Sequence, residues 1–295
     1  MPNVRAIPTV RRRRLGRALR KFRTGAGLSL DQVAELMNTK PGAKWDGPKT
    51  SRIENANAKI SAPEVVTLLG HYGVTDTETV TALEDLARTA GKPGWWSTYG
   101  GIVPPHLEDR IDAETEAKVI RAYYGTVIPG LLQTGAYARE ITAATAFHIP
   151  KEQHPGIVDV RMGRQATLTR PDDPAECWFV IHEALLFQKF TPHPSLMREQ
   201  LMRLLDVSEL PNVNLQVMPL DSGPHPGARG NLSIFHFPKP WPSLVSTESA
   251  GVSHYIEGPE AAERFQKDFD RIVASALPAD RSRDAIRTHM EGMTR

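Results

Sequence analysis

The first ninety residues carry apolar side chains at three- and four-residue spacing, interrupted by short polar turns. This spacing is the period of an amphipathic α-helix whose apolar stripe packs against a core. It predicts five short helices that together form one small all-α domain. We expect these helices at about residues 15–26, 29–37, 49–58, 61–72 and 75–90.

Capping boxes mark three of the predicted helix starts. In each, a hydroxyl at the N-cap accepts an orphan amide of the first turn, while a Glu or Gln three residues later reaches back to the N-cap amide. The three pairs are Ser29 with Gln32, Ser61 with Glu64, and Thr75 with Glu78. The helix boundaries are therefore encoded locally.

Glycine and proline interrupt the pattern over residues 91–105. Since both residues break helices, we predict a linker there. The predicted division of the chain is a first domain at 1–92 with a basic N-terminal arm, a linker at 93–112 and a second domain at 113–295.

The second domain alternates between helical and strand periods. Helical patterns lie at about 112–125, where a turn follows, and at 155–168, 195–207 and 259–277. Strand patterns lie at 177–181, 213–218, 232–237 and 243–247. Such a mixture predicts an α+β fold, and short loops near 208–212 and 238–242 favour a mostly antiparallel sheet.

Composition narrows the class of protein without changing this architecture. Apolar residues make up 40% and charged residues 24% of the 295 residues, as in ordinary globular proteins. No apolar run approaches the ~20 residues of a membrane span, and no apolar signal segment follows the basic start. A single cysteine, Cys177, excludes an internal disulfide and fits a reducing compartment. We predict a cytoplasmic protein without membrane contact.

Charge is distributed unevenly along the chain. Residues 1–60 contain 14 Lys or Arg and 4 Asp or Glu, a balance of +10. The remaining residues contain 22 basic and 30 acidic side chains, a balance of −8. Because binding to nucleic acid relies on cations that displace counterions from phosphates, we expect the N-terminal segment to meet DNA.

The usual sequence signatures of enzymes are missing. There is no H-E-x-x-H zinc motif, no G-x-S-x-G nucleophile elbow and no G-x-x-x-x-G-K-[ST] phosphate loop. The histidines are scattered without metal-ligand spacing, and Cys177 lies in an apolar strand pattern that favours an inert, buried thiol. We predict no catalytic residues, no metal site and no cofactor.

The second and third predicted helices form the element expected to read DNA, with Ile53 as the inward anchor of the third. Polar and cationic side chains at the start of the third helix would enter the major groove, where Arg suits guanine and Ser or Thr is less selective. Amides and side chains at the start of the second helix would contact phosphate. The predicted DNA contacts are Arg13, Arg14, Ser29, Gln32, Lys40, Lys44, Lys49, Thr50, Ser51, Arg52 and Asn55, with Thr50, Ser51 and Arg52 facing bases.

An insertion from Thr39 to Pro48 separates these two helices. Two roles are open for it: Lys40 and Lys44 contact the DNA backbone, or Trp45 packs against the helices. A packing role predicts that Trp45→Ala lowers stability, whereas a backbone role predicts lost affinity with the fold intact.

The residues LGRALRKFRTGAGLSLDQVAELMN, followed by TSRIENANAKISAPEVVTLLGHYGV, resemble the lambda-repressor-like (XRE-type) helix-turn-helix domains. The resemblance lies in the helix order, the Gly-Leu-Ser start of the second helix and the Ser-Arg-Ile-Glu of the third. It implies a compact DNA-binding domain. The chain departs from the usual pattern between Leu36 and Ser51, where the turn is about seven residues longer.

A second resemblance covers the rest of the chain. GTVIPGLLQTGAYARE, with the preceding Trp pair and the later DVRMGRQATLTR and REQLMRLLD, is similar to the C-terminal domain of a large actinobacterial regulator family with a PGLLQT motif. It implies a transcription regulator, often encoded beside a small partner protein in a toxin-antitoxin-like pairing. Where many members have an Asp-Glu pair after a strand, this chain has His182-Glu183.

These observations predict a sequence-specific transcriptional regulator that acts as a homodimer. One small domain reads only a few base pairs, whereas two copies related by a two-fold axis read a pseudo-palindrome. The second domain would supply the dimer surface and bind a small protein encoded nearby or an effector.

A rival hypothesis makes the second domain a small-molecule sensor or an enzyme with the basic domain appended. Trp95, Trp96, Tyr123 and Tyr124 would then line a ligand or partner pocket, since aromatic walls favour ligands. The other role open to the two tryptophans is to dock the linker onto one of the domains.

Overall fold

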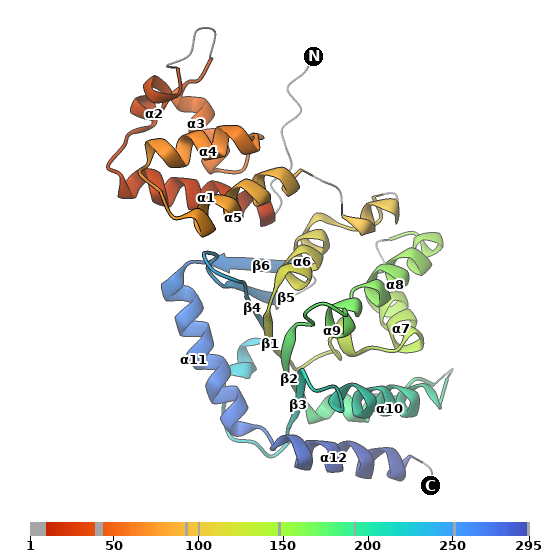
Figure 1. Cartoon of the computed structure of the whole chain (residues 1–295). Coiled ribbons are helices and arrows are strands. Elements are labelled where there is room, and N and C mark those ends of the chain that lie inside the picture. The colour runs from red at the N-terminus through yellow and green to blue at the C-terminus, as the bar shows by residue number, and fades with distance from the viewer. Residues whose placement is uncertain are drawn as a thin grey trace. The chain divides into compact units, whose positions relative to one another are not determined.

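The computed structural model of the chain shows two compact units (Figure 1), Met1–Ser97 with Lys239–Trp241 and Thr98–Pro238 with Pro242–Arg295. The residues that the structure describes are 10–38, 44–91, 94–99, 101–146, 149–191, 193–249 and 252–293. Each unit encloses its own hydrophobic core.

Short helices make up the described part of the first unit. They are α1 (Val10–Gly25), α2 (Leu30–Met37), α3 (Gly47–Glu54), α4 (Ala62–His71) and α5 (Thr77–Thr89), and the 3-10 helix η1 (Trp95–Tyr99) follows. Their apolar stripes meet in a core that contains Leu15, Leu19, Val33, Ile53, Leu68, Leu69 and Leu83. The period read from the sequence therefore identifies the buried faces.

Two of the three predicted capping boxes form, at Ser29 and at Ser61. The third does not, because Asp76 rather than Thr75 is the N-cap of α5 and accepts the Thr79 amide hydrogen. A carboxylate one residue closer to the helix is an equally good cap, so it takes the place of the hydroxyl.

Helices α1 and α3 both begin earlier than predicted. The arginines of 11–14 lie in the first turns of α1 instead of forming a solvated arm, since Arg is a good helix former and no breaker lies between Val10 and Leu15. Helix α3 begins at Gly47 because Asp46 caps it and Pro48 fits the first turn.

A six-stranded mixed sheet forms the centre of the second unit, in the order β3-β2-β1-β4-β5-β6. The strands are β1 (Val119–Tyr124), β2 (Glu176–His182), β3 (Val213–Met218), β4 (Asn231–His236), β5 (Leu244–Ser249) and β6 (Val252–Glu257). Strands β1, β2 and β3 are parallel neighbours, and β1, β4, β5 and β6 pair in antiparallel fashion. The predicted mostly antiparallel sheet is thus corrected to a mixed one, because helical crossovers join β1 to β2 and β2 to β3.

Helices cover both faces of this sheet. In Figure 1, α11 (Pro259–Ser275) runs along one side, and α6 (Pro105–Glu116) with α7 (Gly135–Thr145), α8 (His154–Gly163) and α9 (Ala166–Thr169) lies on the other. Helices α10 (Leu196–Ser208) and α12 (Ala279–Gly292) pack beside β3. The 3-10 helices η2 (Gly130–Leu132), η3 (Lys151–Gln153), η4 (Glu183–Phe187) and η5 (Pro226–Arg229) shape the loops.

The helix predicted at 112–125 is wrong in its second half. Helix α6 starts at Pro105, inside the predicted linker, and ends at Glu116, after which β1 begins at Val119. Val119–Tyr124 is rich in β-branched and aromatic residues, and it pairs with β2 on one side and β4 on the other. The hydrogen bonds of β1 to both neighbouring strands outweigh the helix-like spacing of its apolar residues, which arose by coincidence.

Candidate nucleic-acid interface

Helix α3 is held in a fixed orientation by α1. The guanidinium of Arg23 donates to both carboxylate oxygens of buried Glu54, at 2.6 and 2.9 Å, and to the carbonyl of Leu28 at 2.7 Å. The hydrogen bond from Arg23 to Glu54 raises the pKa of Arg23. This ion pair joins the last turns of α1 and α3.

Gly16 lets the backbones of the two helices approach closely. A Cβ atom at Gly16 would lie 2.6 Å from the carbonyl oxygens of Ile53 and Glu54, well inside van der Waals contact. Helix α3 therefore rests directly on α1, and its opposite face is free to present side chains outward.

Trp45 packs into the core of the first unit, and its side chain is 7% exposed. Its indole Nε1 donates to Thr50 Oγ1 at 2.8 Å, and the Asn38 side chain bonds the Trp45 backbone at both N and O, at 2.9 and 2.7 Å. Lys49 Nζ lies 3.7 Å from the centre of the indole ring. Of the two roles left open for the insertion, the structure shows the packing role for Trp45.

The predicted DNA contacts fall into groups by exposure. Ser29, Gln32, Lys44, Arg52 and Asn55 are exposed, Arg13, Lys49 and Ser51 are half-buried, and Lys40 lies outside the described residues. Arg14 and Thr50 are buried, at 4% and 1% exposure, so neither presents its side chain to DNA as predicted. Thr50 lies three residues before the inward anchor Ile53 and so shares its inward face, which makes the predicted base contact of Thr50 wrong.

Arg52, Ser51 and Asn55 remain on the outward face of α3. Arg52 Nη2 lies 3.7 Å from the Asp46 carboxylate, and Asn55 Nδ2 donates to the Ser51 carbonyl at 2.8 Å. Lys49 instead turns toward α4, where its ammonium lies 3.1 Å from a Glu64 carboxylate oxygen. An Arg guanidinium and a nearby Asn side chain at one surface match the hydrogen-bonding edges of guanine and adenine.

The start of α2 adds groups suited to a phosphate. Gln32 Oε1 accepts the Ser29 amide hydrogen at 2.8 Å, and the exposed Gln32 side chain also carries an NH₂ group that can donate. A helix N-terminus with such a donor is a common contact for DNA backbone oxygens.

The aromatic pocket predicted from Trp95, Trp96, Tyr123 and Tyr124 is not formed by the tyrosines. Consecutive strand residues point to opposite faces of a sheet. Tyr123 packs in the core beneath α11 and touches His225 edge-on, at 5.6 Å between ring centres. Tyr124 faces α6, where it accepts a hydrogen bond from Arg110.

The two tryptophans differ from one another in burial. Trp96 is 6% exposed and Trp95 41%, and their rings meet edge-on at 5.9 Å. Both belong to the first unit.

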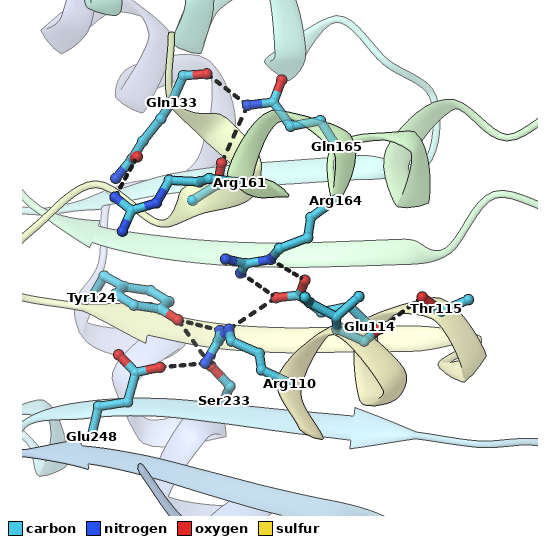
Figure 2. A network of polar contacts seen from close by, with 12 residues as sticks. Arg110, Glu114, Thr115, Tyr124, Gln133, Arg161, Arg164, Gln165, Ser233 and Glu248 are labelled. Atoms are coloured by element: carbon cyan, nitrogen blue, oxygen red, sulfur yellow. Dashed lines mark hydrogen bonds and ion pairs between the residues drawn. The ribbon is translucent and has the colours of Figure 1, made fainter. Parts of the chain in front are cut away.

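A buried polar network that the sequence did not predict lies on the α6 face of the sheet (Figure 2). Glu114 accepts from Arg110 Nε at 2.9 Å and from Arg164 at 2.8 Å to each of its oxygens. Arg110 also bonds Glu248, Tyr124 and Ser233, and so ties α6 to β1, β4 and β5. Burial raises the pKa of Tyr124 to about 12, which keeps its hydroxyl neutral.

The PGLLQT motif forms a turn whose backbone groups are hydrogen-bonded by glutamine side chains. Gln133 Nε2 donates to the Ile128 carbonyl at 2.6 Å, and Gln200 of α10 donates to the Leu132 carbonyl at 2.8 Å and accepts the Thr134 amide hydrogen at 2.7 Å. Gln165 bonds the Gly130 and Gln133 carbonyls, at 3.2 and 2.7 Å. These glutamines satisfy the backbone of a turn buried among helices.

One unused feature of the sequence bears on this network. Arg161, Arg164 and Gln165 lie at i, i+3 and i+4, so they share one face of the helical segment that follows β1. The acidic partners Glu114 and Glu248 lie far along the chain on either side, and no local pattern joins them.

His182-Glu183 also has a local structural role. His182 Nδ1 accepts the Ala184 amide hydrogen at 3.2 Å, and Glu183 Oε2 accepts that of Leu220 at 2.8 Å. Among the described residues, no group of three or more His, Cys, Asp or Glu is arranged to hold a metal ion. Within the same residues, no helix has both the length and the apolar character to cross a membrane.

Comparison with known families matches both units. Residues 14–91 match a family described as a helix-turn-helix domain, and residues 107–288 match one described as a domain of unknown function (DUF5753). A search of curated proteins found no match to the chain. Since the second match covers more than half of the 295 residues, this chain belongs to the DUF5753 family and carries a helix-turn-helix domain before it.

Proposed function

We propose that this protein is a sequence-specific, XRE-type regulator of transcription that reads the major groove with α3. The observation that carries the proposal is the outward face of α3, where Arg52 is exposed on a helix that the buried Arg23–Glu54 pair fixes to α1. It lies in the segment whose charge balance is +10. The match to a helix-turn-helix domain supports it.

The contacts divide by role. Arg52 would donate to a guanine, Ser51 and Asn55 would bond neighbouring base edges, and the start of α2 with Gln32 would fix the register on phosphate. Lys44 and Arg13 would add attraction to the backbone that carries no sequence information.

The DUF5753 domain would mediate dimerisation and bind a small partner protein or an effector. A two-fold dimer would place two α3 helices about one turn of DNA, ~34 Å, apart. This arrangement supports recognition of a pseudo-palindrome by a domain that alone reads few base pairs. Binding to chromosomal DNA would also imply the cytoplasmic location predicted from the sequence.

The test selects bound sequences from random DNA with the full-length protein and measures affinity for the best site by mobility shift. Arg52→Ala should weaken binding about 5- to 150-fold, as expected for the loss of one bidentate base contact. Arg88→Ala is the matched control, because Arg88 is an exposed cation of α5 paired with Glu84 and Asp85. Its affinity should match that of the wild type.

Salt and stoichiometry complete the test. The logarithm of the binding constant should fall linearly with the logarithm of salt concentration. Binding that is independent of salt, or equal losses in Arg52→Ala and Arg88→Ala, would overturn the assignment of α3. A complex of one protein chain per selected site would overturn the dimer.

A further inference from the structure

Among the described residues, the polar network of the second unit joins arginines to glutamates through hydrogen bonds and ion pairs. Three guanidiniums, those of Arg110, Arg161 and Arg164, gather around two carboxylates, those of Glu114 and Glu248. Arg110 contacts both carboxylates, and Arg164 binds both oxygens of Glu114. Among the described residues, the two carboxylates therefore accept hydrogen bonds from Arg110 and Arg164 and none from Arg161.

Arg161 has a neutral partner instead. Its Nη1 donates to Gln133 Oε1 at 3.0 Å, and among the described residues its guanidinium forms no ion pair. Figure 2 shows the difference: Arg110 and Arg164 are joined to carboxylates, and Arg161 is joined to the Gln133 amide. A guanidinium has five N–H donors, so most of those of Arg161 find no protein acceptor in the described part of the chain.

The surroundings of Arg161 disfavour a guanidinium cation without a counter-charge. Burial, and then the neighbouring charge of Arg164, lower the pKa of Arg161 to about 10. Removing a charge from water is costly unless an opposite charge or hydrogen bonds replace the water. The Arg161 side chain is half-buried rather than fully enclosed, so part of its surface remains accessible to solvent.

We propose that Arg161 anchors a binding site for a small anionic ligand, recognised through a carboxylate or phosphate group. Gln133 holds one edge of the guanidinium, and the remaining N–H groups form the planar donor set that binds such anions in bidentate fashion. Arg164 and Arg110 add positive potential. Gly130 lies beside the aliphatic part of the Arg161 side chain. A Cβ atom at this position would lie 3.4 Å from Arg161 Cγ.

The site is built by neighbouring elements that fix one another. Arg161 comes from α8, Gln133 from the turn after η2, and Gln133 is itself held by its bond to the Ile128 carbonyl. The anion would supply the missing counter-charge. This proposal concerns ligand binding alone and does not depend on DNA binding.

The test uses full-length protein without DNA. Inorganic phosphate and acetate are titrated separately at constant ionic strength, with chloride as the balancing ion, and binding is followed by calorimetry and by melting temperature. Wild-type protein should bind at least one of the two anions. A response to phosphate alone identifies a phosphate ligand, and a response to acetate alone identifies a carboxylate.

Arg161→Gln should weaken this binding at least about tenfold, as the loss of a charge-assisted hydrogen bond predicts. Arg281→Gln removes an exposed arginine of α12 with the same change of net charge and should bind as the wild type does. Arg161→Lys keeps the charge but not the planar donor set, so it should fall between the two.

Hydrogen exchange on the wild-type protein locates the site without any substitution, and so remains informative if Arg161→Gln does not fold. The anion should slow exchange in peptides that cover 129–134 and 154–165. No binding by the wild type, equal binding by Arg161→Gln, or protection confined to residues 10–91 would each overturn the proposal.

Discussion

At the scale of single residues, the most consequential side chain is Glu114, which is 1% exposed and lies between two guanidiniums. Burial by itself raises the pKa of a carboxyl group, but Arg164 and Arg110 outweigh this effect and hold the pKa of Glu114 below its usual value. The carboxylate is therefore charged at neutral pH. Among the described residues it is the ion-pair partner of Arg164 and one of the two carboxylates paired with Arg110.

Glu114→Gln should lower the free energy of unfolding by about 3–5 kcal/mol at pH 7, because it leaves Arg110 and Arg164 without their shared counter-charge. Urea denaturation measures the loss. Glu152→Gln is the control, since Glu152 is exposed on η3 and should change stability by less than about 0.5 kcal/mol.

The same variant tests the direction of the pKa shift. A carboxyl group with a depressed pKa in the folded state stabilises the protein fully above its unfolded pKa, and this contribution is lost as the pH falls through the folded pKa. The gap between wild type and Glu114→Gln should therefore be constant near neutral pH and shrink only below about pH 4.5, the unfolded value. A gap that widens with acid would contradict the assignment.

Trp45→Ala is expected to lower stability by about 3–5 kcal/mol, because it leaves a cavity in the first core and removes the indole hydrogen bond to Thr50 Oγ1. Chemical denaturation measures this loss. DNA affinity, measured well below the melting temperature, should stay near that of the wild type. Trp95→Ala, at a position 41% exposed, provides the comparison and should cost less. Lost affinity in a Trp45→Ala protein of normal stability would restore the backbone-contact role of the insertion.

At the scale of elements, the orientation of α3 depends on its close approach to α1 at Gly16. Sequence periodicity located both helices but gave no sign that glycine was needed there. The requirement arises only because the carbonyl oxygens of Ile53 and Glu54 lie against the α-carbon of Gly16.

Gly16→Ala should lower the free energy of unfolding by about 1–3 kcal/mol and weaken DNA binding, since the backbone of α3 must move to admit the methyl group. Gly25→Ala is a matched control at the end of the same helix, where a Cβ meets nothing within 4 Å. It should be neutral or stabilise by up to about 1 kcal/mol through helix propensity. Thermal melts and mobility shifts on both variants separate a steric effect from a propensity effect.

The sequence predicted secondary structure correctly where short-range signals were sufficient to define the element. The strand predicted at 213–218 is confirmed as β3, and the helix predicted at 195–207 corresponds to α10. Residues 119–124 were predicted as helix, because their apolar spacing fits both periods and only pairing partners distant in the chain favour the strand. Strand β6, which follows β5 directly in the chain and pairs with it at the edge of the sheet, was not predicted from the sequence.

At the scale of the whole molecule, the chain holds two separate cores, one around Leu69 in the helix-turn-helix unit and one around Ile234 in the DUF5753 unit. Separate cores imply that a defect in one need not spread to the other. The uneven charge follows the same division, since the basic excess lies in residues 1–60.

Leu69→Ala, at a fully buried position, should destabilise the first unit by about 2–5 kcal/mol. Hydrogen exchange measured by mass spectrometry should speed up in peptides within 44–91 and stay unchanged in peptides covering 119–124 and 177–181. The matched variant in the other core is Ile234→Ala on β4, which should give the reverse pattern. Equal acceleration throughout the chain in either variant would show that the two units unfold together.

The sequence by itself determined the features that depend on neighbours within a few residues. These include the helices of the first unit, two capping boxes, most strands of the second unit and the concentration of positive charge where DNA is proposed to bind. It also marked Ile53 as an inward anchor, from which the burial of Thr50 follows.

Tertiary structure alone decided which side chains meet across the chain. The Arg110–Glu248 contact joins residues 138 positions apart, and the Glu114–Arg164 contact joins residues 50 apart. It also decided that Tyr123 and Tyr124 face opposite sides of a sheet, that Trp45 is buried, and that Arg161 has no carboxylate of its own among the described residues. The physical reason is that helix and strand signals act over one or two turns of chain, whereas burial and charge pairing are set by packing between elements.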